Sequence, residues 1–203
     1  MRRKVFDKLA SVGGAVAVAA LVVVGSLLMV GYGFANNYVH NQLSEQQITF
    51  PSAAAFAHPD GTEITNSMIP SVSHYAGQQL LTGQQAQVYA NDFIAVHLRE
   101  IGGGKTYAQL SQAAMALPKG SAAYNKAEGT VQTVFQGTTL RGLLLEAYGF
   151  SLIATIAFWC GIAAFGLAGI LAVLVVLGFV HARRTDEDEE MMARHPRDEA
   201  LAA

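Results

Sequence analysis

The most constraining feature of the chain is an uncharged segment that runs from Ala147 to Val180. It contains no Asp, Glu, Lys, Arg or His, and Arg183 and Arg184 follow it closely. As a single helix the segment would be roughly 50 Å long, whereas the hydrocarbon core of a bilayer is about 30 Å thick. Such a segment is typical of a transmembrane helix that tilts or projects beyond the lipid. We therefore predict a transmembrane helix over residues 146–181, continuous with an outer helix that begins near residue 139.

A second uncharged segment, from Leu9 to Ala35, follows a basic leader at the N-terminus. A cleaved secretory signal and an uncleaved membrane anchor are the two interpretations of it. The segment ends in Gly33-Phe34-Ala35, which has the spacing of a cleavage site, but the apolar region of a signal usually has only about 7–15 residues. Because this segment is much longer, we predict a basic cytoplasmic N-terminus over residues 1–8 and a transmembrane helix over residues 9–35.

The placement of basic residues predicts the orientation of the chain. They cluster before the first span and again at Arg183 and Arg184, whereas no Lys or Arg occurs between Leu9 and Leu98. Basic loops stay on the cytoplasmic side of a membrane. We therefore expect a multi-pass protein of the bacterial plasma membrane with both termini cytoplasmic. Residues 36–145 would form an extracytoplasmic domain, and residues 182–203 an acidic cytoplasmic tail.

The intervening residues show helical patterns and no strand-like alternation of useful length. We expect the first span to continue outward as a helix as far as Phe50-Pro51, because proline disfavours helix in the residue before it. Residues 50–70 contain several prolines and are predicted to form an ordered loop. A helical pattern begins again at Ser71, with a break at Gly77.

Two capping-box signatures mark the starts of further helices. In each, a threonine stands at the N-cap position and a glutamine follows three residues later, as in Thr82 with Gln85 and Thr106 with Gln109. The first of these helices is expected to stop at Gly102-Gly-Gly104, a run suited to a left-handed cap.

The last part of the domain is predicted as two separate helices. Leu117-Pro118 would end the preceding helix, and a new helix would cover residues 121–136 with Gly137 as its C-cap. A final helix would then enter the membrane. The predicted fold class is all-α, with two transmembrane helices flanking a small helical extracytoplasmic domain.

Two groups of side chains are the candidate functional residues. One is an aromatic set expected to line an apolar pocket or to form the bundle core: Tyr75, Tyr89, Phe93, Tyr107 and Phe135. The other is a face of small residues on the second span, expected to pack against another helix: Ala157, Gly161, Ala164, Ala168 and Ala172. Either the first span, where Gly13-x3-Ala17 is a weaker counterpart, or another membrane subunit could occupy this face.

The sequence contains no motif that indicates catalysis or a bound cofactor. No histidine lies in the interior of a predicted span, and His181 stands at the cytoplasmic edge of the second. Paired Cys-His or HExxH spacing is also absent, so we predict no haem and no metal site. The single cysteine, Cys160, lies within the second span. The run Gly102 to Thr106 resembles a phosphate-binding loop, but its first glycine is misplaced, and we interpret it as a turn. The net charge of −2 argues against nucleic-acid binding.

Several short patterns between Thr49 and the second span resemble a family of small two-span membrane proteins from actinobacteria. They are Tyr75-Ala-Gly-Gln-Gln79, Ala86-x2-Tyr89-Ala90, Ile94-x2-His97-Leu98, Gly103-x2-Thr106-Tyr107 and Thr139-Leu-Arg-Gly-Leu-Leu144. The resemblance implies a fold with two spans and no established activity. Members often carry the automatic label aromatic ring-opening dioxygenase. That label implies an iron enzyme, and we reject it because the two-histidine, one-carboxylate ligand pattern is missing.

The expected function is therefore non-enzymatic. We predict an accessory or stabilising subunit of a larger cell-envelope membrane complex, in contact with membrane lipid and with another membrane protein subunit. The alternative is an outward-facing module that binds or senses a ligand or a lipid. No cofactor is expected in either case.

Overall fold

The computed structural model describes residues 3–59 and 64–184, which form helices and one isolated β-bridge, between Thr49 and Gln79. The chain divides into two compact units. Met1–Tyr32 with Ile156–Ala203 make up the first, here called the paired-helix unit, and Gly33–Thr155 make up the second, here called the helical domain. The predicted all-helical class with two long apolar helices is confirmed.

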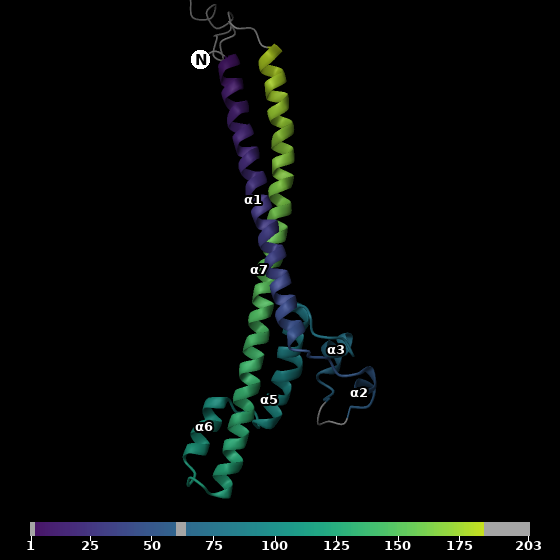
Figure 1. Ribbon diagram of the computed structural model, residues 1–203, viewed down its shortest axis with the longest axis vertical. Coiled ribbons are helices and arrows are strands. Elements are labelled where there is room, and N and C mark those ends of the chain that lie inside the picture. The colour runs from purple at the N-terminus through teal and green to yellow at the C-terminus, as the bar shows by residue number, and fades with distance from the viewer. Residues whose placement is uncertain (1–2, 60–63, 185–203) are drawn as a thin grey trace, which may run out of the picture. The chain divides into compact units, whose positions relative to one another are not determined.

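Helix α1 (Arg3–Glu45) and helix α7 (Ala122–Arg184) are both long and apolar enough to cross a membrane. Figure 1 shows the N-terminal stretch of α1, in purple, and the C-terminal stretch of α7, in yellow-green, running side by side. Helix α1 ends at Glu45 rather than at the expected Phe50-Pro51. Gln46 and Gln47 close a turn onto the end of the helix, and Gln47 has a positive φ of 52°. The turn at Gln46 and Gln47 therefore ends the helix, and Pro51 does not.

The segment expected to be a loop over residues 50–70 contains a helix. α2 (Ala53–Ala57) begins at the N-cap Ser52, whose hydroxyl accepts a hydrogen bond from the Ala55 amide. α3 (Ile69–Val72) and the 3-10 helix η1 (Ser73–Tyr75) follow, and Gly77 has a φ of 70°. The expected break at Gly77 is thus confirmed, because a left-handed residue ends the helical turn.

The next helix has three consecutive parts: α4 (Gly83–Val88), the π-helical η2 (Tyr89–Ile94) and α5 (Ala95–Ile101). The capping box that the sequence predicts at its start is present. Gln85 is buried, and its Oε1 accepts hydrogen bonds from the amides of Leu81 (2.8 Å) and Thr82 (3.0 Å). Its Nε2 donates to Gln78 Oε1 at 3.2 Å. One side chain therefore satisfies the backbone at the entry to the helix.

The glycine run after α5 and the second capping box also match the predictions. Gly103 and Gly104 both have positive φ, and the Thr106 box opens α6 (Tyr107–Met115). The expected C-cap at Gly137 is wrong, because α7 is unbroken from Ala122 to Arg184. A Cβ on Gly137 would overlap the Leu98 side chain, so the glycine allows α5 to pack closely against α7 instead of ending a helix.

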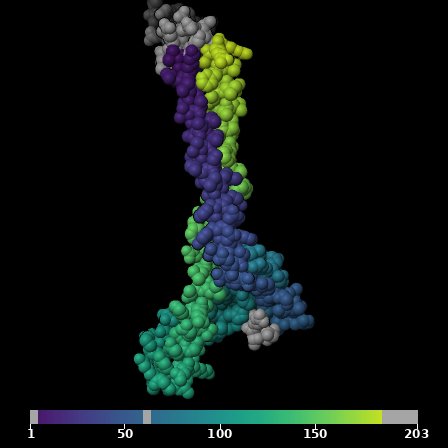
Figure 2. All heavy atoms as spheres, in the orientation of Figure 1, coloured from purple at the N-terminus to yellow at the C-terminus, as the bar shows by residue number. Residues whose placement is uncertain are grey.

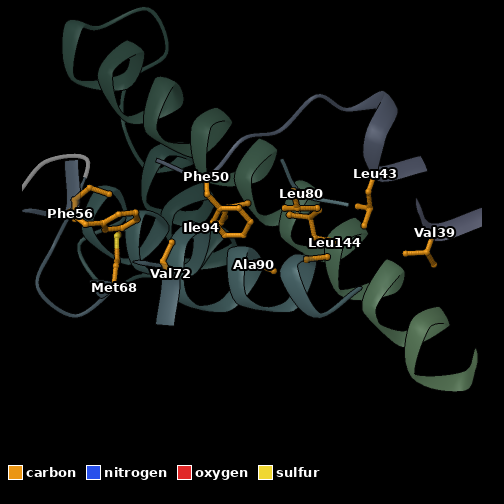
Figure 3. Close-up of a cluster of buried hydrophobic side chains, with 12 residues drawn as sticks. Val39, Leu43, Phe50, Phe56, Met68, Val72, Leu80, Ala90, Ile94 and Leu144 are labelled. Atoms are coloured by element: carbon orange, nitrogen blue, oxygen red, sulfur yellow. The ribbon is translucent and has the colours of Figure 1, made fainter. Parts of the chain in front are cut away.

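The core of the helical domain is one cluster of buried apolar side chains (Figure 3). Phe56, Met68 and Val72 gather at one end of it, while Leu80, Leu144 and Leu43 meet at the other. Phe50, Ile64, Met68, Leu80 and Val72 are its largest fully buried members. Four of these five side chains, all except Val72, come from residues outside the helices, so the connecting segments supply the largest buried side chains of the core.

Candidate functional site

Within the paired-helix unit, α1 and α7 pack antiparallel in a regular register. A Cβ built on Gly14 would lie 2.6 Å from Val175 Cγ2, and one on Gly25 would lie 3.1 Å from the Phe165 ring. Further along the same contact, the rings of Tyr32 and Phe158 have centroids 5.0 Å apart. Figure 2 shows the purple and yellow-green atoms in contact along this stretch. At Gly14 and Gly25 the two helices thus interlock by placing a large residue of α7 against a glycine of α1, and at Tyr32 the contact is between two rings.

The buried positions on α7 recur every three or four residues. Within the paired-helix unit, the buried or partly buried positions of this stripe are Ala157, Gly161, Ala164, Ala168, Ala172, Val175, Gly178 and Ala182, while most of the large apolar residues between them are exposed. This is the heptad-like spacing of a left-handed helix pair. Ser11 and Gly25 are the matching buried positions on α1.

The face of small residues expected on the second span lies on this buried stripe. Gly161, Ala164 and Ala168 are buried, and Ala157 and Ala172 are partly buried. A Cβ on Gly161 would lie 3.0 Å from Met29 Sδ and 3.4 Å from the carbonyl oxygen of Gly25. The chain's own helix α1 therefore occupies the face. The counterpart expected on α1 is wrong, since Gly13 and Ala17 are exposed and no atom lies within 4 Å of a Cβ on Gly13.

The aromatic set divides into two groups. Tyr75 and Tyr89 pack on the buried Phe50, each with a ring-centroid distance of 5.2 Å, and Phe93 continues the row 4.7 Å beyond Tyr89. This group belongs to the core. Phe50 was not part of the predicted aromatic set, because it lies outside any helical pattern.

Tyr107 and Phe135 form the second group, away from that row. Their ring centroids are 5.5 Å apart, and the two residues are 41% and 48% exposed. They join the start of α6 to α7 and leave much of both rings on the surface. We refer to these two residues as the exposed aromatic pair.

The histidines and carboxylates do not gather into a metal site. Within residues 3–59 and 64–184, no group of three or more His, Cys, Asp or Glu side chains could hold an ion. His97 Nδ1 lies 3.0 Å from the Phe93 carbonyl oxygen, one turn earlier on the same helix. His181 Nε2 lies 3.8 Å from Asp7 Oδ2 in the paired-helix unit. The His97 contact lies within one helix, and the His181 contact joins α7 to α1. Neither belongs to a group of three possible metal ligands among the described residues.

An apolar cavity of about 230 Å³ lies in the helical domain between the end of α1 and α7. Its walls are mainly apolar, with Glu146 and two glutamines among them; the apolar lining includes Tyr38, Val39, Leu43, Leu140, Leu144 and Phe150. Leu144 and Leu43 also belong to the core, so the cavity extends the core towards the surface.

No protein-family model, curated protein or solved structure matches this chain. The resemblance to actinobacterial two-span proteins therefore stays a prediction.

Proposed function

We propose that the protein is a two-span protein of the bacterial plasma membrane that acts without catalysis, as an accessory subunit of a larger envelope complex. Its termini would be cytoplasmic, and the helical domain would bind the partner outside the cell. The main support for a contact with a partner is the exposed aromatic pair. Aromatic rings left on a surface are enriched at the centres of protein interfaces, where they contribute much of the binding energy.

Insertion in a membrane is supported by the exposure of the apolar helices. Only 6% of the most apolar stretch of α1 and 11% of that of α7 is buried within the chain. The core helix of a soluble protein would be mostly buried, and a large exposed apolar surface in water promotes aggregation. A lipid environment would remove this cost for residues such as Val16, Leu27 and Ile170, which are all more than 60% exposed.

The interlocked register of α1 and α7 favours an anchor over a cleaved signal. The pairs from Ser11–Gly178 to Tyr32–Phe158 cover a rise of roughly 30 Å, the thickness of a hydrocarbon core. Removal of the first span would expose Gly161, Ala164 and Ala168 of α7. A segment that fits its partner over the whole span is expected to remain in the mature protein.

Crosslinking in native membranes tests this function. A photo-reactive amino acid replaces Phe135 in the full-length chain, and Gln84, an exposed polar residue on α4, serves as the control position. We expect the Phe135 probe to give one discrete protein adduct that the Gln84 probe does not give. If neither position yields an adduct beyond the free protein, the accessory-subunit function is wrong.

The alternative function, an outward-facing module for a ligand or a lipid, is favoured by the apolar cavity between α1 and α7. Leu143 and Phe150, which line this cavity, are 59% and 44% exposed and lie on either side of the start of the uncharged segment of α7. An acyl chain is the ligand that suits such walls. Lipid that remains with the purified protein through extended washing, and is lost in a Leu144→Gln variant, would favour the alternative over the accessory subunit.

A further inference from the structure

A second cavity of the helical domain, of about 360 Å³, is lined by three cationic side chains and by no acidic one. Arg99 comes from α5, Lys105 from the turn before α6, and Arg141 from α7. Leu98, Val134 and Tyr107 add apolar and aromatic walls. We call this the basic cavity. Three separate elements of the fold therefore bring positive charge to one place.

The helical domain as a whole is not basic, so this concentration is not a property of its composition. Residues 33–155 contain five basic side chains, which are Arg99, Lys105, Lys119, Lys126 and Arg141. They contain seven acidic ones, which are Glu45, Asp60, Glu63, Asp92, Glu100, Glu128 and Glu146. The basic cavity holds three of the five positive charges and none of the seven negative ones. Like charges held together raise one another's energy unless an anion joins them.

Arg141 is fixed in place but not neutralised. Its Nη2 donates a hydrogen bond of 2.8 Å to Oδ1 of Asn91, a neutral residue of η2. Its Nε is buried and has no hydrogen-bond partner among the described residues. None of the three cations of the basic cavity lies in an ion pair with a carboxylate of residues 3–59 or 64–184. A buried donor without a partner is uncommon in native proteins and calls for a reason.

The glycine turn beside the cavity is not the anion-binding element. The amides of Gly103, Gly104 and Lys105 donate to the carbonyl oxygens of Glu100 (3.1 Å), Arg99 (2.7 Å) and Gly102 (3.1 Å). These bonds close the end of α5 and leave the turn no amides for a ligand. The amides of Tyr107 and Ala108, in contrast, stand in the first turn of α6, where they have no acceptor within the helix, and both residues line the cavity.

We propose that the basic cavity binds a phosphate group carried by a small organic molecule. Two guanidinium groups and one ammonium group match the charge and the several oxygens of a phosphate, and the first turn of α6 adds to the same field. The apolar walls suit the glycerol or alkyl part of such a ligand. The phosphate comes either from the headgroup of an anionic phospholipid or from a soluble phosphate ester. The cavity shares Tyr107 with the exposed aromatic pair, but Phe135, Arg99 and Lys105 each belong to only one of the two sites. Variants of Arg99 and Lys105 therefore test phosphate binding separately from the Phe135 probe of the partner contact.

The test uses the full-length protein in a neutral detergent and isothermal titration calorimetry. Glycerol 3-phosphate represents the soluble ester, dihexanoyl phosphatidylglycerol the anionic lipid, and dihexanoyl phosphatidylcholine a lipid of zero net charge. We compare the wild type with the double variant Arg99→Gln/Lys105→Gln. The control is Lys119→Gln/Lys126→Gln, which removes the same charge from exposed residues of the same domain that do not line the cavity.

We expect saturable binding with a dissociation constant below about 1 mM. The cavity variant should bind about tenfold more weakly or worse, because it loses two charge-assisted contacts, whereas the control should stay within about twofold of the wild type. Stronger binding of phosphatidylglycerol than of glycerol 3-phosphate would identify the lipid headgroup as the source, and the reverse would identify a soluble ester. Three results would overturn the proposal: equal weakening in the two double variants, no saturation with either anionic probe up to about 10 mM, or phosphatidylcholine binding as tightly as the better of the two anionic probes.

Discussion

Replacing Gly83 with alanine is expected to destabilise the helical domain, because the glycine is buried where α4 meets α7. A Cβ on Gly83 would lie 2.6 Å from Ser151 Oγ and closer still to Ser151 Cβ, and it would lie 3.3 Å from the Ala147 carbonyl oxygen. Carbon atoms in contact are about 3.5–4.0 Å apart. Since the Ser151 Cβ is attached directly to the backbone, no change of rotamer moves it away. The two helices would have to separate by about 1 Å or more.

The expected cost follows from that separation. Forcing an extra methyl group into a packed interface costs about 1–3 kcal/mol, and a clash with atoms that cannot rotate away belongs at the upper end. Gly83 is also the first residue of α4, two positions before the buried Gln85, so a shift strains the capping network as well. We therefore expect a loss of about 2–3 kcal/mol, which lowers the urea midpoint of the domain by about 1–2 M.

Pulse proteolysis with thermolysin across a urea series, in a mild detergent, measures this midpoint. The decisive comparison is the double variant Gly83→Ala/Ser151→Gly, because glycine at 151 removes both atoms that meet the new methyl group. It should regain most of the loss, less about 1 kcal/mol for a glycine inside a helix. Gly149→Ala, with no atom within 4 Å of its Cβ, is the control and should not lower the midpoint. Additive losses in the double variant would refute the reasoning.

The other predictions concern glycines and one polar side chain. Gly161→Leu should abolish crosslinking between cysteines placed at opposing positions of α1 and α7, whereas Gly166→Leu should leave it intact, because only the Cβ of residue 161 would meet the other helix. Gly129→Ala should raise the urea midpoint of the domain through a gain of about 0.5–1 kcal/mol in helix propensity, and Gly137→Ala should not, since its methyl group overlaps Leu98. Gln85→Ala should cost about 1–2 kcal/mol in the same assay, because the partly buried amides of Leu81 and Thr82 lose their acceptor.

Those parts of the fold that local chemistry determines were predictable from the sequence. The capping boxes at Thr82 and Thr106 and the left-handed glycines after α5 are each specified within a few residues. The uncharged segments likewise predict two long apolar helices from composition alone. The short helix α2 was missed because it has only five residues, too few to show a period.

Features that depend on a distant neighbour were not predictable. Gly137 has the sequence appearance of a C-cap, and only the approach of Leu98 shows that it serves a close helix contact. Phe50 is buried by tyrosines that lie far from it in the sequence. The basic cavity has the same origin, because Arg99 and Arg141 meet only through the packing of α5 beside α7. A single sequence gives spacing along a helix, but not which helix lies opposite.

The pairing of α1 with α7 also decides which surfaces of these two helices remain for another protein. The small face around Gly161 is filled by Met29 and Gly25, so a partner helix would reach it only by displacing α1. Gly166 and Gly169 are exposed and have open space around them, so a helix in the bilayer could approach α7 closely there. Gly166→Leu thus separates two sources of partner binding. Loss of the Phe135 adduct in that variant would place part of the interface in the bilayer, whereas an unchanged adduct would assign the interface to the helical domain alone.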